Sequence, residues 1–198
     1  MTPNDCTVMG LILAGGQSAR MQPYDKRWLE WDGRPLWQHA VCSLQPQVHA
    51  VTLVVDGDAK RYRLDGLRVI TDTGPAHQGP LAGVITGLEF AKTHEYDVMI
   101  TAPVDAPRLP PHYAKQLLHA MQGVSAAYLV GDSPRYTLAS WPVRALPALS
   151  ARFLAGERSL KGALAAVNAV ELTWAEADLP ENLNTRAQWQ RWCARNGL

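Results

Sequence analysis

The amino-acid sequence predicts an α/β protein with a doubly wound, mostly parallel sheet. Short apolar runs rich in β-branched residues alternate with segments of helical character, which is typical of right-handed strand–helix–strand units. Most of these runs are apolar at nearly every position, which favours strands covered by helices on both faces. Because no repeat or low-complexity linker interrupts this order, we expect residues 1–198 to form a single domain with a Rossmann-like arrangement.

The expected elements follow this alternation along the chain. The predicted strands are Val8–Leu13, Val51–Val55, Leu67–Thr71, Val98–Thr101, Ala126–Val130 and Tyr136–Trp141. The last of these can run antiparallel to the others. The predicted helices are Pro35–Leu44, Pro80–Thr93, Pro110–Met121, Ala145–Leu154, Leu160–Val167 and Thr185–Asn196. Since the fixed φ of proline suits the first turn of a helix, we expect helices to begin at Pro80 and Pro110.

The composition is that of an ordinary globular protein. The 198 residues are 47% apolar and 19% charged, with a formal net charge of +1. A near-neutral chain without a tract of basic residues lacks the electrostatic signature of binding to nucleic acid or to a membrane surface, so we expect neither. The three cysteines are far apart, which fits a reducing compartment. Without a signal-peptide pattern or a membrane-length apolar run, we expect a cytoplasmic protein.

The first candidate site follows the first strand. Ligands of open α/β sheets bind beyond the carboxyl ends of the strands, and there the chain reads LAGGQSARMQPYDK over residues 13–26. Gly15 and Gly16 allow a tight turn whose backbone amides can face an anion. Arg20 and Lys26 would supply positive charge. The phosphate loops GxxxxGK[ST] and GxGxxG are absent, and an ordinary strand-ending turn is the alternative.

Two later loops carry further candidates. Gly79–Gly83, with the sequence GPLAG, opens a helix whose free amides can hydrogen-bond a base or a phosphate. Asp105 follows a strand and has prolines on either side, which is a suitable place for Mg²⁺, an ion that prefers one or two carboxylates together with substrate phosphates. A plain helix start and a turn aspartate are the alternatives.

Other polar and aromatic residues near these loops have simpler interpretations. We expect Asp56 and Asp58 to be solvated turn residues. We expect the tryptophans near the first loop to belong to the core rather than to stack on the ring of a ligand, because buried aromatic side chains are usually core residues. These tryptophans are Trp28, Trp31 and Trp37.

The motifs together resemble one family. Leu13–Met21 followed by Asp25–Lys26 resembles the nucleotidyltransferase signature LAGGxSxRM…DK, in the form found in molybdenum cofactor guanylyltransferases. The segment WLEWDGRPLWQH (28–39) resembles the family's LLELNGKPLWQH, GPLAG is a family motif, and Asn182–Thr185 resembles NxNTPEEL. The resemblance extends from Val8 to about Trp189, and it departs from the family after Met21, where Gln22 stands in place of a glycine.

The resemblance implies Mg²⁺-dependent transfer of GMP from GTP to the phosphate of the molybdopterin cofactor, with release of pyrophosphate. It implies that Arg20, Lys26 and Asp105 are catalytic and that Asp105 binds the metal. The nucleotide contacts that it implies are Leu13, Ala14, Gly15, Gly16, Lys26, Asp72, Gly79, Pro80, Leu81 and Asp105. The pterin contacts that it implies are Gly83, Asn182 and Asn184. A transient partner, either a cofactor-delivery protein or a molybdoenzyme, is expected to receive the product.

The protein needs to supply little covalent chemistry for such a reaction. In-line positioning and neutralisation of charge supply most of the rate, and the phosphate of the acceptor is already ionised, so no strong general base is needed. A related nucleotidyltransferase that uses CTP or a sugar phosphate is one alternative. A non-catalytic nucleotide-binding or cofactor-binding relative is another, although Arg20, Lys26 and Asp105 occurring together favour catalysis. Near the C-terminus, Asn184 or Thr185 could also act as a helix cap.

Overall fold

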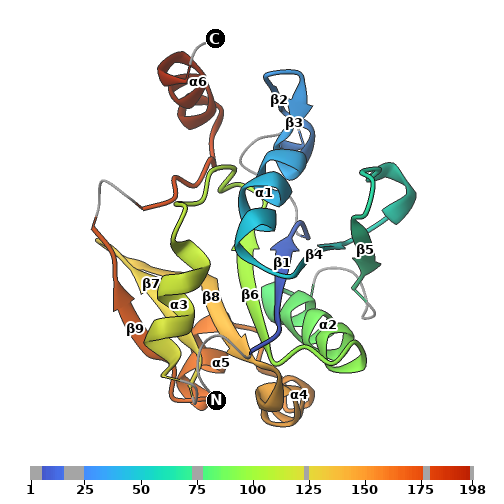
Figure 1. The fold of residues 1–198 in the computed structure, drawn as a ribbon, viewed down its shortest axis with the longest axis vertical. Coiled ribbons are helices and arrows are strands. Elements are labelled where there is room, and N and C mark those ends of the chain that lie inside the picture. The colour runs from blue at the N-terminus through green and yellow to red at the C-terminus, as the bar shows by residue number, and fades with distance from the viewer. Residues whose placement is uncertain (1–5, 16–24, 73–77, 123–124, 176–178, 197–198) are drawn as a thin grey trace.

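The structure is a computed structural model that describes residues 6–15, 25–72, 78–122, 125–175 and 179–196. It forms one seven-stranded sheet, in the order β5–β4–β1–β6–β8–β7–β9, and a separate two-stranded hairpin (Figure 1). The first four strands of that order are β5 (Arg68–Thr71), β4 (Ala50–Val55), β1 (Val8–Leu13) and β6 (Val98–Pro103). The others are β8 (Pro134–Pro142), β7 (Ala127–Val130) and β9 (Val170–Thr173).

The pairing of the strands confirms the mostly parallel, doubly wound sheet. β1 pairs in parallel with β4 and β6, and β4 with β5. β8 is antiparallel to both of its neighbours, β6 and β7, while β9 is parallel to β7. Strand β8 therefore opposes the other six, as its sequence allowed. The carboxyl ends of β1, β4, β5 and β6 meet at one edge of the sheet.

Helices cover both faces of the sheet. On one face, α1 (Leu36–Leu44) and α3 (Tyr113–Met121) pack on a core that includes Ile12 of β1. On the other face, α2 (Pro80–Thr93), α4 (Leu146–Leu154) and α5 (Leu160–Ala166) pack on a second core that includes Leu11 and Leu13. Successive side chains of a strand point to opposite faces, so a strand that is apolar throughout feeds both cores, and the continuous apolar runs were read correctly.

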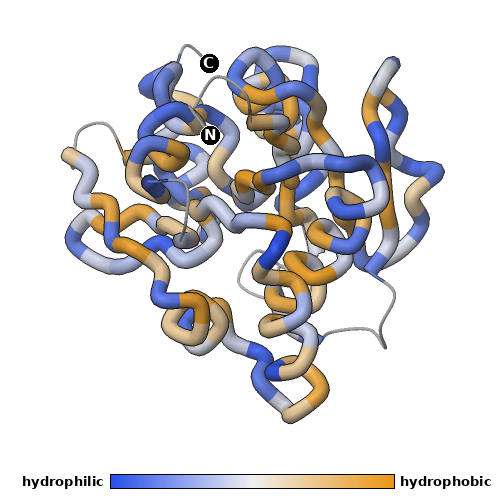
Figure 2. Tube along the Cα trace, turned by 60° about the horizontal axis from the view of Figure 1, so that its bottom comes forward, coloured by the Kyte–Doolittle hydropathy of each residue, from blue (hydrophilic) through white to orange (hydrophobic). Residues whose placement is uncertain are grey.

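The last helix, α6 (Arg186–Arg195), lies apart from these layers and packs on the hairpin of β2 (Glu30–Trp31) and β3 (Arg34–Pro35). The rings of Trp31 and Trp192 meet edge to face, with their centroids 4.7 Å apart. Shorter 3-10 turns are η2 (Lys26–Trp28), η3 (Gln45–Gln47), η4 (Ala59–Arg61) and η5 (Val143–Ala145). Figure 2 shows apolar residues along the strands and helices and hydrophilic residues along many of the outer connections.

The secondary structure differs from the sequence prediction at three main places. The third helix begins at Tyr113 rather than at Pro110. Pro111 disfavours helical geometry at the residue before it, and this moves Pro110 out of the helix. The β2–β3 hairpin and β9 were not predicted. The hairpin turns at Asp32 and Gly33, both with positive φ, and Asp-Gly is the dipeptide that favours such a two-residue turn.

In the described part of the chain, no helix combines the length and the apolar character that crossing a bilayer requires. The core instead depends on close packing of α2 against the central strands. A Cβ atom placed on Gly87 would lie 2.4 Å from Leu11 Cδ2 and 2.8 Å from Met99 Sδ. Gly87 therefore allows α2 to approach β1 and β6 more closely than any other residue would permit.

We expect Gly87→Ala to destabilise the protein, because overpacking of a full core costs about 1–3 kcal/mol and outweighs the roughly 1 kcal/mol by which alanine favours a helix. Gly83→Ala, one turn earlier, is the matched control, since its added Cβ would meet Leu13 and Val54 at an ordinary 3.4 Å. Urea unfolding of both variants tests this. Equal free energies of unfolding for the two would show that the close approach at Gly87 is not needed.

Candidate active site

The first loop begins where β1 ends, between two neighbouring parallel strands. The amide of Ala14 donates to the carbonyl of Val54 at 2.9 Å, and the amide of Val104 donates to the carbonyl of Leu13 at 3.0 Å. Ala14 thus continues the sheet, and an anion would meet the loop beyond it. Gly15 lies in the described part of the loop, whereas the predicted residues Gly16 and Arg20 lie outside the described residues.

A pocket of about 140 Å³ gathers most of the predicted nucleotide-binding residues. It lies at the carboxyl ends of β1, β4 and β5, beside the start of α2. Its lining residues are Leu13, Gly15, Val54, Val55, Asp56, Asp72, Gln78, Gly79, Pro80 and Gly83. Gly83, which the resemblance assigns to the pterin, shares this pocket with the nucleotide candidates. The side chain of Leu81 is fully buried, so it can reach a ligand only through its backbone.

The start of α2 has the geometry that anion binding requires. Gly79 has a φ of +83° at the N-cap, Pro80 occupies the first turn, and no side chain makes a capping hydrogen bond there. The first amides of a helix have no partner within the helix, and the helix dipole favours negative charge at this end. Asp72 is held opposite by two contacts: its amide donates to Val55 O at 3.1 Å, and the Thr86 hydroxyl donates to its Oδ1 at 3.3 Å.

Lys26 and Asp105 come together at the end of the site nearest β6. Lys26 Nζ lies 2.6 Å from Asp105 Oδ2, although the two residues are far apart in the sequence. Asp105 is 5% exposed, and within the described residues its other oxygen, Oδ1, is buried without a hydrogen-bond partner. A buried carboxylate oxygen without a donor is costly, and a cation would remove that cost.

The donor set fits a magnesium ion held mainly by its substrate. Among the described residues, no group of three or more histidine, cysteine or acidic side chains lies close enough to form a metal site. Mg²⁺ keeps several waters and takes one or two carboxylates plus substrate phosphates. A single buried aspartate beside a phosphate-binding loop matches that pattern, and Asp105 is the residue that would hold the ion.

The C-terminal asparagines belong to a segment that contacts Asp105. The amide of Leu183 donates to the carbonyl of Asp105 at 2.8 Å, so the segment that carries Asn182 and Asn184 contacts the backbone of the predicted metal ligand. Asn182 Oδ1 is buried, and no hydrogen-bond partner is found for it among the described residues. Thr185 caps α6 and forms a capping box with Gln188, so the helix-cap interpretation is confirmed for Thr185.

Arg27 is a residue of this site that the sequence analysis missed. Its guanidinium donates to both carboxylate oxygens of Asp25 at 2.7–2.9 Å, to Asp56 Oδ1 at 2.6 Å and to Ala14 O at 3.0 Å. The expectation that Asp56 is a solvated turn residue is therefore wrong, because its side chain is 16% exposed and ion-paired. The expectation for Asp58 is correct, since it caps the turn η4.

The electrostatics of this cluster follow from its contacts. Burial would raise the pKa of Asp25, but its hydrogen bonds with Arg27 and the charges of Arg27 and Arg61 hold that pKa below its usual value. Burial would likewise lower the pKa of Arg27, but the hydrogen bond with Asp25 and the surrounding negative charges raise it. Both groups are therefore ionised at neutral pH.

The tryptophans belong to the core, as expected. Trp37 is 3% exposed, and Trp28 packs between Trp37 and Tyr62 with ring centroids 6.3 Å and 5.0 Å away. Trp31 packs on α6 in a third apolar cluster. A stacking role for these rings would require them to leave contacts that hold the fold.

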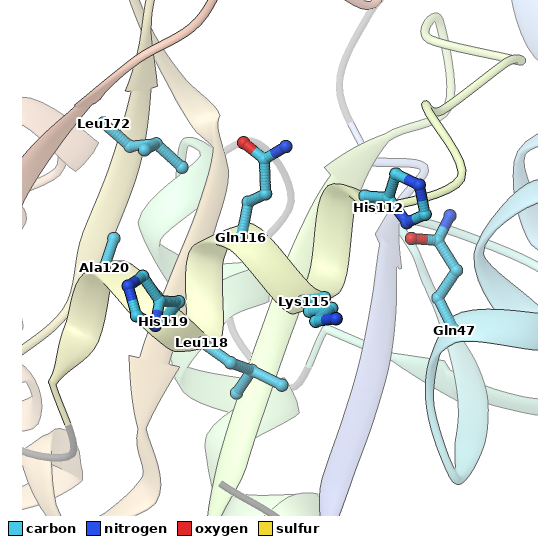
Figure 3. A pocket seen from close by; sticks show the side chains of 8 residues that line it. All are labelled: Gln47, His112, Lys115, Gln116, Leu118, His119, Ala120 and Leu172. Atoms are coloured by element: carbon cyan, nitrogen blue, oxygen red, sulfur yellow. The ribbon is translucent and has the colours of Figure 1, made fainter.

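A larger groove of about 690 Å³ lies along the outer side of α3 (Figure 3). It contains none of the predicted site residues. Its lining residues are Gln47, His112, Lys115, Gln116, Leu118, His119, Ala120 and Leu172. These come from α3, η3 and β9, so the groove is separate from the cluster around Asp105.

The sheet, the glycine pocket and the Lys26–Asp105 pair define an α/β protein with a candidate nucleotide site at the carboxyl ends of its parallel strands. The chain belongs to the family of proteins with a MobA-like NTP transferase domain, whose model matches residues 10–177. The family is one of nucleotidyltransferases, which confirms the expected class of enzyme and its fold.

The sequences of relatives agree with this family, and solved structures share the fold. A molybdenum cofactor guanylyltransferase of Cereibacter sphaeroides is 37% identical, with 89% of this chain and 91% of the relative covered. A molybdenum cofactor guanylyltransferase of Yersinia pestis (strain Pestoides F) is 34% identical, with 97% of this chain and 96% of the relative covered. The structure of molybdopterin-guanine dinucleotide biosynthesis protein A from Archaeoglobus fulgidus shares the fold at 20% identity, with a TM-score of 0.73 and 94% and 99% covered. Rv0371C from Mycobacterium tuberculosis, solved in complex with manganese, shares it at 15%, with a TM-score of 0.67 and 95% and 98% covered.

We expect Asp25→Asn to lower the Tm at neutral pH by about 2–4 °C, the shift that about 1 kcal/mol produces in a chain of this length. A carboxyl group whose pKa is lowered by folding stabilises the protein above its unfolded pKa of about 4 and loses that effect as the pH falls through the folded value. The difference in Tm between wild type and variant should therefore shrink towards pH 3 in scanning calorimetry. A difference that stays constant over that range would contradict the assignment.

Proposed function

We propose that this protein is a molybdenum cofactor guanylyltransferase. An oxygen of the molybdopterin phosphate attacks the α-phosphorus of GTP, the bond between the α-phosphorus and the bridging oxygen breaks, and pyrophosphate leaves. Two relatives with this name match nearly the whole chain at 34–37% identity. The observation that carries the proposal is the buried Asp105, with one oxygen on Lys26 and the other without a partner among the described residues, next to the glycine pocket.

Different residues at the carboxyl ends of the strands bind the nucleotide and its phosphates. The pocket formed by Leu13, Gly15, Asp72 and the start of α2 binds the nucleotide. Gly16 and Ala14 belong to the same loop, and Arg20 and Lys26 provide positive charge for the phosphates. Such fixed charges stabilise a phosphoryl transition state because they need no reorganisation during the reaction.

Asp105 would hold Mg²⁺, which would neutralise part of the phosphate charge. In the structure Lys26 is the counterion of Asp105. A divalent cation at Asp105 would take over that role, and the ammonium of Lys26 would then be available to the triphosphate. The close contact gives each charge a partner in a partly buried position, where an isolated charge would be unfavourable.

The acceptor binds on the opposite side of Asp105. Asn182 and Asn184 supply hydrogen-bonding groups there, and Gly83 borders the pocket from α2. Amide side chains suit a pterin ring, whose edge presents both donors and acceptors. The product then passes to a transient cofactor-delivery protein or to a molybdoenzyme in the cytoplasm.

Calorimetric titration of GTP, CTP and ATP, each with Mg²⁺, tests the nucleotide part of the proposal. We expect selective binding of GTP, and a loss of affinity of roughly tenfold or more in Asp105→Asn, since a hydrogen bond or ion contact to a charged group contributes about 1.5–3 kcal/mol. Release of pyrophosphate with molybdopterin as acceptor tests the transfer. A preference for CTP would make the protein a cytidylyltransferase, and binding without pyrophosphate release would make it a non-catalytic relative.

We expect Asn182→Ala to raise the KM for molybdopterin severalfold while the affinity for GTP changes little, because Asn182 adjoins Leu183, which contacts the Asp105 carbonyl, and does not line the nucleotide pocket. Its effect should be compared with that of Gly83→Ala, which narrows the pocket itself and should weaken GTP binding as well. Steady-state kinetics with each substrate varied in turn separate the two. An Asn182→Ala enzyme with weakened GTP binding and an unchanged KM for the acceptor would contradict this assignment.

A further inference from the structure

Arg27 connects three segments that each end at the nucleotide site. One is the end of β1, through the carbonyl of Ala14. The second is the corner before η2, through the two oxygens of Asp25. The third is the end of β4, through Asp56, which also lines the pocket. The guanidinium is 18% exposed, so these contacts are partly shielded from water and from salt.

The contact with Asp25 determines where Lys26 points. Asp25 caps η2, accepting a hydrogen bond from the Arg27 amide at 3.1 Å, and Lys26 is the first residue of that turn. Because Arg27 holds Asp25 from the side chain and is tied to Ala14 at the strand end, the turn has a fixed position relative to the sheet. Lys26 Nζ reaches Asp105 from this turn.

The contact with Asp56 has an electrostatic consequence. Asp56 and Asp72 both line the pocket, and two negative carboxylates would repel a triphosphate. Charges a few ångströms apart near a protein surface attract or repel each other strongly. A guanidinium on Asp56 removes much of this repulsion while the carboxylate stays in place.

We propose that Arg27 is a positioning residue for nucleotide transfer: it fixes the turn that carries Lys26 against the end of β1, and it neutralises Asp56 at the wall of the pocket. This inference rests on the proposed function, because it assumes that an anionic nucleotide occupies that pocket. It assigns to Arg27 a role that lysine cannot fill, since only the planar fork can contact Asp25, Asp56 and Ala14 O at once.

Four variants separate the two parts of this role. Arg27→Gln removes both the contact that fixes the turn and the charge that neutralises Asp56. We therefore expect the affinity for Mg²⁺–nucleotide to fall roughly tenfold or more and kcat to fall as well. Adding Asp56→Asn removes the exposed charge, so the double variant should recover most of the affinity but not kcat. Asp56→Asn alone should bind nucleotide at least as tightly as the wild type, because it removes a negative charge from the pocket wall. Arg27→Lys restores charge without the fork, so it too should recover affinity more than kcat.

The control is Arg152→Gln, which makes the same substitution on the exposed surface of α4. That helix follows β8, whose last residue pairs with Val98 at the amino end of β6, so it lies at the opposite edge of the sheet from Asp105. Calorimetry gives the affinity, pyrophosphate release gives kcat, and the Tm shows that each variant is folded. If Arg27→Gln does not fold, Arg27→Lys carries the comparison.

The affinity defect of Arg27→Gln should also shrink as ionic strength rises, because salt screens the repulsion from Asp56. An Arg27→Gln protein with wild-type affinity and kcat would overturn the inference, and so would a double variant that recovers no affinity. These outcomes are distinct from failure of the proposed function, which would appear in the wild type as a preference for another nucleotide or as the absence of guanylyl transfer. A wild type that binds no nucleotide would overturn both.

Discussion

The contact between Lys26 and Asp105 is the one on which the rest of the site depends. The two groups lie 2.6 Å apart, and Lys26 reaches its partner only because η2 folds back over the end of β1. Asp105 is held in turn by the backbone: Val104 donates to Leu13, and Leu183 donates to the carbonyl of Asp105. One buried carboxylate is therefore surrounded by turn η2, the end of β6 and the C-terminal segment. All three segments must be in place for the charge pair to form.

Packing on α6 holds the C-terminal segment in its position next to Asp105. Leu183 is fully buried with Leu36 and Trp192 in an apolar cluster separate from the two main cores, and Trp31 of the hairpin packs against Trp192. The hairpin and α6 therefore hold the segment that contains Leu183, whose amide contacts Asp105. The short two-stranded hairpin, which is not part of the main sheet, contributes to the site in this indirect way.

The sequence predicted the parts of this protein that depend on local pattern. Continuous apolar runs identified the central strands, Pro80 marked the start of α2, and the loops at the strand ends gave Asp72, Gly79 and Asp105. It did not predict the partners that the fold brings together. Nothing around Asp56 shows that Arg27, at 29 residues' separation, will neutralise it, and β9 is short and largely exposed, so it has little apolar signal. The hairpin was missed although Asp32-Gly33 was a readable turn signal.

The charge pairs also indicate how the pocket recognises its ligand. The chain has a net charge of only +1, so each acidic group at the site needs a local counterion. Asp105 has Lys26, while Asp25 and Asp56 share Arg27. Asp72 differs, because the side-chain contact described for its carboxylate comes from the neutral hydroxyl of Thr86. A carboxylate that lines a pocket together with glycines can accept hydrogen bonds from N–H and O–H donors. Asp72 is therefore suited to the N–H or O–H donors of a base or a ribose.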